Sequence, residues 1–201
     1  MAPPFLRLLP AMLLLGALPV LADKNAPAPP PAFRPVEVTD AWFTQEKVGI
    51  FQVELEKTAT YLAIFVHRNF TPAVRKGNTE ARLYARRYLS LALHVDPHNA
   101  AAQKVNRWLA EGTEVAEDIP LPQDEKHFVE AVVRLNRQLA ARPEPAAKRL
   151  RGFLSLVAAD LDPKNEEAVY EAELFRREEK NLMQAWKDLA QGRKLPASAT
   201  P

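Results

Sequence analysis

Cysteine is absent from this sequence of 201 residues. Its absence excludes a disulfide framework, a thiolate nucleophile, a zinc or iron–sulfur site with cysteine ligands and a lipid-modified N-terminal cysteine. Glycine is scarce, at 6 residues, which is too few for the glycine-rich loops that bind phosphate groups. Neither sign of charge dominates, since 27 lysines and arginines stand against 25 aspartates and glutamates. This balance gives the chain no long-range attraction to DNA, RNA or an anionic membrane.

The remaining composition is that of a globular protein. Hydrophobic residues make up 47% of the chain and charged residues 26%, which excludes a wholly disordered chain. The length suffices for one ordinary domain with little left for a second. Prolines are frequent, at 18, and five of them fall within residues 26–35. Such a stretch favours an extended polyproline II spacer, because proline cannot donate a backbone hydrogen bond.

The N-terminal segment 1–22 has the features of a signal peptide. Arg7 is its only charged side chain, and an uncharged, mostly apolar run follows from Leu8 to Leu21. The length of this run fits a signal-peptide core and is shorter than the ~20 residues that span a bilayer. Short side chains before position 23 predict cleavage after Ala22, and hence a periplasmic or secreted protein with no integral membrane span after cleavage. The alternative is a retained N-terminal anchor, which the two prolines and the glycine inside the run disfavour.

We therefore expect four segments along the chain. They are a signal peptide at 1–22, a proline-rich linker at 23–39, a helical domain at 40–192 and a disordered tail at 193–201. Within the domain, residues 40–56 leave two alternatives open. Phe43, Phe51 and Leu55 suit a helix, whereas the alternation of Phe51, Val53 and Leu55 with polar residues suits a strand. Because the segments that follow have helical periodicity, we expect a helix here as well.

A short motif occurs twice at a fixed distance. Asp-Pro-x-Asn-x-x-Ala begins at Asp96 and again at Asp162, which gives a period of 66. The residue before a proline is disfavoured in the α-helical region, so the incoming helix ends there. We expect Asp96 and Asp162 to cap the next helix with their carboxylates. We expect Pro97 and Pro163 to occupy the first helical position, where a missing N–H costs nothing. The motif thus predicts two equivalent helix junctions.

The sequence around the two motifs repeats one apolar pattern at the same offset. In each copy the paired positions are three and four residues apart, which defines one helical face. The offset predicts an internal duplication, with helices at 57–70, 79–95 and 98–111 and then at 124–142, 146–161 and 164–180. A further amphipathic segment that ends near Gly192 predicts a C-terminal capping helix. The paired apolar positions beside the motif are Ala81 with Ala147, Tyr84 with Leu150, Tyr88 with Leu154, Leu91 with Val157, Ala92 with Ala158 and Val95 with Leu161.

One known repeat family shares part of this pattern. The stretch from Ala85 through Ala92 to Asn99 resembles the second helix and the exit of a tetratricopeptide repeat in the spacing of its small residues before Asp-Pro-x-Asn. The second copy is similar but has Arg151 where the first has Ala85, and the first-helix tryptophan and tyrosine signature of the family is absent. A period of 66 is close to two such repeats. The resemblance implies an all-α array of helical hairpins, in which this repeating unit occurs twice and a capping helix follows.

Candidate catalytic and metal-binding groups are few. His94 and His98 are spaced four residues apart, but Pro97 breaks the helix between them and a third ligand is lacking. The sequence contains neither a nucleophile elbow nor a glycine-rich phosphate loop. We therefore predict no enzymatic activity, no cofactor and no bound metal. The alternative is a small envelope enzyme or accessory subunit, whose polar site between helices would contain two or more of His94, His98, Arg82, Arg86 and Glu130.

Stacked helical repeats expose an extended surface, which suits an adaptor. We therefore predict an exported helical-repeat protein that binds a protein or peptide partner, with its oligomeric state left open. Arg82 and Arg86 are one helical turn apart and can meet one acidic segment, and Arg75 extends this basic face. Trp42 and Trp186, at the two ends of the array, are the aromatic candidates for partner binding. A membrane-tethered scaffold with an uncleaved N-terminal anchor is a further alternative.

Overall fold

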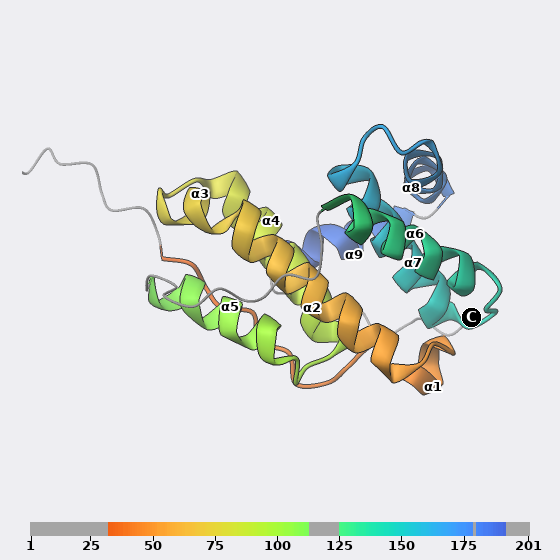
Figure 1. The fold of residues 1–201 in the computed structure, drawn as a ribbon, viewed down its shortest axis with the longest axis horizontal. Coiled ribbons are helices and arrows are strands. Elements are labelled where there is room, and N and C mark those ends of the chain that lie inside the picture. Colours follow the sequence, from red (N-terminus) through yellow and green to blue (C-terminus); the bar gives the residue numbers. More distant parts are fainter. Residues whose placement is uncertain (1–31, 113–124, 179, 192–201) are drawn as a thin grey trace, which may run out of the picture. The chain divides into compact units, whose positions relative to one another are not determined.

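Helices make up most of the described part of this protein. The structure, a computed structural model, describes residues 32–112, 125–178 and 180–191, which belong to one unit, Pro31–Pro201. Over these residues 77% of the chain lies in nine helices and no strand is present (Figure 1). The predicted all-α fold is confirmed. The predicted signal peptide at 1–22 and tail at 193–201 lie outside the described residues, so both stay predictions.

The predicted helices of the two copies are present with small shifts at their ends. The first copy, called the first repeat below, contains α2–α5, and the second repeat contains α6–α8. None of the helices in the described ranges is long and apolar enough to cross a membrane. The bounds are α1 Gln45–Val48, α2 Gln52–Asn69, α3 Thr71–Arg75, α4 Thr79–Val95, α5 Ala100–Glu111, α6 Glu125–Ala140, α7 Pro145–Leu161, α8 Glu166–Glu178 and α9 Lys180–Gln191.

The Asp-Pro junctions exist, but asparagine caps the helix that follows each of them. Asn99 is the N-cap of α5, and its Oδ1 accepts a hydrogen bond from the backbone N–H three residues on, at 3.1 Å. Asn165 holds the same position before α8 and accepts the equivalent bond at 3.0 Å. The expected capping by Asp96 and Asp162 is therefore wrong, and the cap is the fourth residue of the motif.

The aspartates shape the turn between the helices. Asp96 is the C-cap of α4 and Asp162 is the C-cap of α7. The Oδ1 of each accepts a hydrogen bond from the backbone N–H two residues on, at 3.0 Å and 3.1 Å. A side chain bonded in this way forms an Asx turn, which delays the start of the next helix. Pro97 and Pro163 consequently lie inside the turn, and their expected place at the first helical position is wrong as well.

The two repeats share the packing of their first two long helices but differ in the third. α4 lies along α2, and α7 lies along α6 in the same way. In contrast, α5 packs mainly against α2, whereas α8 packs mainly against α7. The equivalence that the sequence predicts therefore holds for the helical hairpin and its exit turn. Paired positions with matching burial are Ala81 with Ala147, Tyr88 with Leu154, Leu91 with Val157, and Ala92 with Ala158.

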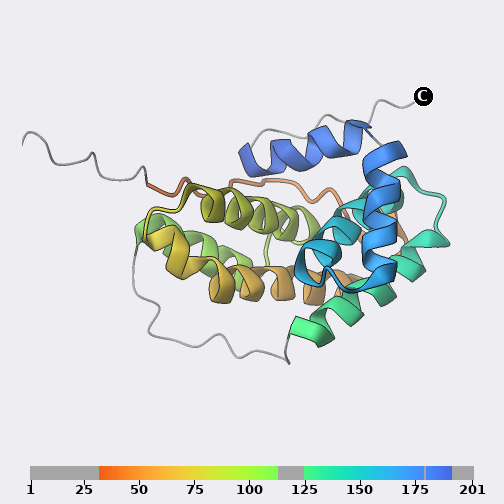
Figure 2. The same cartoon turned by 90° about the horizontal axis from the view of Figure 1, so that it is seen from above.

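The C-terminal helix α9 packs against helices of both repeats. It packs mainly against α4 and also contacts α7 and α8 (Figure 2). Trp186 of α9 stacks on Phe153 of α7 at 5.4 Å between ring centroids and meets Tyr88 of α4 edge-on at 6.1 Å. Gly152 of α7 permits this approach, because a Cβ there would collide with the Leu182 side chain of α9. One aromatic side chain thus joins three helices from both halves of the duplication.

Residues 32–44 contain no helix or strand, yet part of this segment packs on the helices. Phe33 and Val36, which we expected in the proline-rich linker, are 6% and 5% exposed. Phe43 is buried too and contacts the second repeat through Phe153. Farther along, α1 ends at Gly49 with φ 66°, a left-handed conformation that favours glycine, and α2 begins three residues later. In the segment 40–56 the strand alternative is therefore wrong, and the expected helix is interrupted.

Candidate functional site

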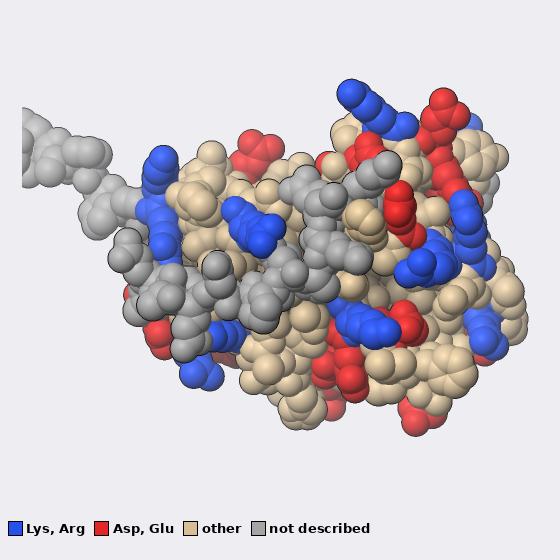
Figure 3. All heavy atoms as spheres, in the orientation of Figure 1, with Lys and Arg blue, Asp and Glu red and all other residues tan. Residues whose placement is uncertain are grey.

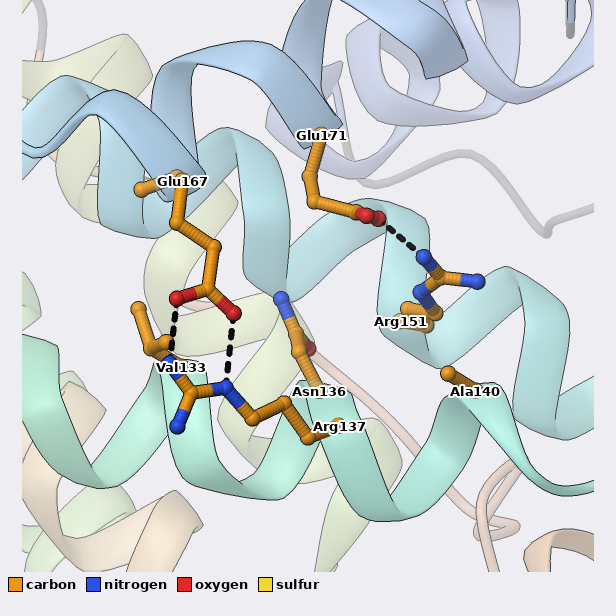
Figure 4. A pocket seen from close by; sticks show the side chains of 8 residues that line it. Val133, Asn136, Arg137, Ala140, Arg151, Glu167 and Glu171 are labelled. Carbon is orange, nitrogen blue, oxygen red and sulfur yellow. Dashed lines mark hydrogen bonds and ion pairs between the residues drawn. The ribbon is translucent and has the colours of Figure 1, made fainter.

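A polar cleft opens between α6, α7 and α8. Its empty volume is about 350 Å³. The periodicity of α6 places four side chains on one wall, at intervals of three and four residues. Figure 4 shows these side chains together with those of α7 and α8, and Figure 3 shows acidic and basic side chains intermingled over the second repeat. The lining residues are Val133, Asn136, Arg137, Ala140, Arg151, Glu167, Ala168 and Glu171.

An exposed ion pair stands on one side of the cleft. Arg137 of α6 donates two hydrogen bonds to the Glu167 carboxylate of α8, one of them from Nε at 2.7 Å. The hydrogen bond to Glu167 raises the pKa of Arg137, and the same bond lowers the pKa of Glu167. The two side chains are 68% and 42% exposed, so water competes for both partners. Because both partners are exposed to water, a pair of this kind contributes little to stability and opens easily.

A second ion pair on the other side is more deeply placed. Arg151 of α7 is bonded to the Glu171 carboxylate of α8, and the two side chains are 26% and 21% exposed. The Arg151 guanidinium also lies over the Phe175 ring, at 5.6 Å from its centroid. These contacts hold the guanidinium from two directions. The inner pair, Arg151 with Glu171, therefore forms a fixed wall of the cleft. The outer pair, Arg137 with Glu167, can exchange its partners.

Between the two ion pairs lies the amide of Asn136, of which 6% is exposed (Figure 4). Its Nδ2 donates to the Ser155 hydroxyl at 2.8 Å, and that hydroxyl donates to the Arg151 carbonyl at 2.9 Å. The single hydroxyl hydrogen of Ser155 is used in the second bond, so the serine oxygen must accept from the amide. This chain of bonds fixes the orientation of the amide and leaves the Asn136 Oδ1 without a partner among the described residues.

The arrangement suits recognition of a polar group. A buried acceptor without a partner costs about 1–3 kcal/mol relative to a bonded one. An N–H group brought to the Asn136 Oδ1 would recover that free energy. Arg137 lines the same cleft as Asn136, and its planar guanidinium can donate two parallel hydrogen bonds to a carboxylate. The cleft thus has one exchangeable cation that suits an acidic group, beside a buried acceptor that has no partner among the described residues.

The basic face that the sequence predicts is divided in the structure. Arg86 turns inward, where its Nε donates to the Ala190 carbonyl of α9 at 2.8 Å and its Nη1 donates to the Arg34 carbonyl. Burial, and then the charge of Arg34, lower the pKa of Arg86. Arg82 is half-buried with an unpaired Nε, and Arg75 is exposed at the end of α3. The prediction that Arg86 joins Arg82 in an exposed pair is wrong, because backbone carbonyls already bind its guanidinium.

The two predicted tryptophans occupy different environments. Trp186 is 4% exposed and belongs to the core, so its expected role as a partner contact is wrong. Trp42 is half-buried beside the His94 ring, at 4.9 Å between centroids, and under the Arg149 guanidinium at 5.7 Å. His94 is buried, and this burial lowers its pKa to about 4, although a bond to the Asp40 backbone acts in the opposite direction.

The polar site that we named for an enzyme is not the cleft described above. None of its five candidate residues lines the cleft. His98 and Glu130 are exposed, and His94 lies at the buried end of α4. Within the described ranges, no three histidine, aspartate or glutamate side chains are grouped so as to hold a metal ion.

Sequence reasoning missed the residues that form the cleft. Asn136 gave a signal, because it interrupts the apolar stripe of α6 between Val132 and Leu139. Glu167 and Glu171 are one turn apart on α8, but acidic residues at the start of a helix are commonly explained by the helix dipole alone. Their pairing with arginines of two other helices follows from the packing of α8 against α7.

Comparison of the chain with models of known protein families, with curated proteins and with solved structures found no match.

Proposed function

We propose that this chain is an exported helical-repeat adaptor, and that it binds an exposed segment of a partner protein in the cleft between α6, α7 and α8. The observation that carries the proposal is the Asn136 Oδ1, a buried acceptor with no partner that lies between two arginine–glutamate pairs. Most buried polar atoms of native proteins are paired, and this unpaired one belongs to a side chain that lines the cleft beside an exchangeable cation, which supports the proposal. The signal-peptide features of residues 1–22 support export.

The binding step follows from the different exposure of the two ion pairs. An acidic side chain of the partner would take over Arg137 from Glu167, and opening of this pair would give a backbone N–H of the same segment access to the Asn136 Oδ1, which is buried in the unbound chain. The exchange is cheap because the outer pair is exposed on both sides. The inner pair, Arg151 with Glu171, keeps the wall in place during the exchange. The resemblance to tetratricopeptide repeats agrees with an adaptor role and stays a prediction.

Site-specific crosslinking in the exporting host tests this proposal. A photo-crosslinking amino acid replaces Ala140, which lines the cleft, and in a matched control it replaces Gln138, which is exposed on α6 outside the lining. We expect a discrete crosslinked partner from position 140 and none from position 138. Asn136→Leu, which keeps the branched shape of the side chain and removes the acceptor together with the donor to Ser155, should abolish the crosslink.

A pair of arginine variants separates the cleft from general surface charge. Arg137→Ala should weaken capture of the partner by about tenfold or more, since it removes a charge-assisted hydrogen bond to the acidic side chain of the partner. Arg176→Ala removes a similar exposed ion pair of α8, with Glu173, that does not line the cleft. We expect this control to bind as the native chain does. Equal crosslinking from positions 138 and 140, or capture that neither Asn136→Leu nor Arg137→Ala reduces, would refute the proposal.

Sequencing of the N-terminus of the exported protein tests the predicted signal peptide and its cleavage after Ala22. A product that begins at Asp23 supports cleavage, whereas a product that retains residues 1–22 supports the membrane-tethered alternative.

A further inference from the structure

We propose that the surface of α4 and α5 that binds Phe33–Val36 through Arg86 and Asn106, called the groove below, is a peptide-docking site, which the chain's own segment occupies until an extended segment of a partner protein displaces it. The expected ligand carries two apolar side chains three residues apart and a proline between them. This surface belongs to the first repeat and is independent of the cleft between α6, α7 and α8.

The seated segment is bound as a peptide ligand would be. Phe33 and Val36 are buried, whereas Arg34 and Pro35 between them are exposed. A spacing of three residues between buried side chains fits a polyproline II helix, which has three residues per turn. Pro35 favours this conformation because its ring fixes φ. Two side chains buried at this spacing favour an extended, proline-containing peptide as the ligand.

Side chains of the helices bind the backbone of the segment. The Asn106 amide of α5 pairs with both backbone groups of Val36: the Val36 N–H donates to Oδ1 at 2.9 Å, and Nδ2 donates to the Val36 carbonyl at 2.8 Å. Arg86 of α4 donates to the Arg34 carbonyl and at the same time to the Ala190 carbonyl of α9. Figures 1 and 2 show the segment running along these helices. Contacts of this kind recognise any extended backbone, because they involve no side chain of the segment.

The chain that follows the segment permits its release. Glu37, Thr39 and Asp40 are exposed, and residues 37–41 lie in neither a helix nor a strand. Val38 packs partly against the core, and the His94 side chain is bonded to the Asp40 backbone. The backbone anchor that follows is separate from the segment: the Trp42 and Phe43 N–H groups donate to the His94 carbonyl at 2.8 Å and 3.2 Å. Phe33–Val36 can therefore leave its groove while Trp42 and Phe43 stay in place. A tethered segment competes at a high effective concentration, so the native chain binds a partner weakly until the partner is abundant.

The full chain and a synthetic peptide with the sequence of residues 32–40 provide the test. In Phe33→Asp/Val36→Asp the chain's own segment loses both apolar anchors and vacates the groove. We expect this variant to bind the peptide at least about tenfold more tightly than the native chain, because intramolecular competition is removed. Adding Asn106→Ala should abolish the gain, and a peptide with aspartate at both apolar positions should not bind. Far-ultraviolet circular dichroism verifies that each variant is folded.

A second measurement uses the native chain and does not depend on the fold of any variant. In the ¹⁵N-labelled protein, excess peptide should increase hydrogen exchange at the Val36 N–H, which loses its bond to Asn106, and should leave the capped Ala102 N–H unchanged. Unchanged Val36 exchange together with no tighter binding by the released variant would overturn the proposal. Dimerisation of the native chain that is lost in Phe33→Asp/Val36→Asp would also overturn it, because the groove would then serve a second copy.

Discussion

The two asparagine caps allow the stability of the two helix junctions to be compared directly. Asn99 and Asn165 occupy the same position in the repeated motif, and each accepts one hydrogen bond from its helix. Replacement by alanine removes that bond in both repeats. We predict that Asn165→Ala lowers the free energy of unfolding by about 1 kcal/mol, the usual contribution of an N-cap side chain.

Asn99→Ala should cost more, because the Asn99 amide also connects α5 with α2. Its Nδ2 lies within hydrogen-bond distance of the Glu56 carbonyl at 3.2 Å and of the Thr60 hydroxyl at 2.9 Å. Asn99 is 6% exposed, so water does not replace these bonds fully, and each contributes about 0.5–1.5 kcal/mol. We therefore predict a loss of about 2–3 kcal/mol for Asn99→Ala. At about 2–4 °C per kcal/mol, its melting temperature should fall by about 4–12 °C, against about 2–4 °C for Asn165→Ala.

Urea denaturation followed by circular dichroism measures both losses. Serine variants separate the two contributions of Asn99, since serine keeps a capping oxygen and lacks the amide donors. Asn165→Ser should stay within about 0.5 kcal/mol of the native chain, whereas Asn99→Ser should retain most of the extra loss. Equal losses for Asn99→Ala and Asn165→Ala would refute the role of the Asn99 amide between the two helices. A larger loss for Asp96→Ala than for Asn99→Ala would refute the assignment of the cap.

Three further predictions concern the packing of α4, α7 and α9. Gly152→Ala should destabilise the protein by about 1–3 kcal/mol in urea denaturation, because the added methyl collides with Leu182, whereas an exposed helical glycine would gain from the same change. Arg86→Ala should lower the melting temperature by more than Arg82→Ala, since Arg86 donates to two backbone carbonyls; equal effects would contradict this. The free energy of unfolding should fall by about 3 kcal/mol in total as the pH decreases from about 6.5 to about 4. The reason is that burial keeps His94 unprotonated in the folded chain, whereas the unfolded chain binds a proton at this histidine. His94→Gln should flatten this part of the pH profile, and an unchanged profile would refute the assignment.

The helical hairpins could be predicted from the sequence because their signals are local. Apolar residues at intervals of three and four define the faces of α4 and α7, and the motif at Asp96 and Asp162 marks where those helices end. Because the same pattern recurs 66 residues later, each helix predicted in the first copy also predicts its counterpart in the second. The identity of the cap was less accessible, because both the aspartate and the asparagine of the motif are good capping residues. Only the Asx turn in the structure decides between them.

The cleft could not be predicted in the same way, because its residues come from three helices. Asn136, Arg151 and Glu171 meet only because α8 packs against α7 in the second repeat, where the equivalent helix of the first repeat packs against α2 instead. The same apolar pattern supports both arrangements. No local rule therefore separates them.

Charge and aromatic patterns were the least reliable guides to the surface. Arginine and tryptophan are common in binding sites. In this structure, however, Arg86 binds backbone carbonyls, and Trp186 packs between three helices. Periodicity and turn chemistry, which depend on neighbours in the sequence, determined the helices and the points where α4 and α7 end, whereas the duplication stays a prediction. The packing of α9 on α4 and the seating of Phe33 and Val36 were decided by the tertiary structure, because burial depends on contacts between residues far apart in the chain.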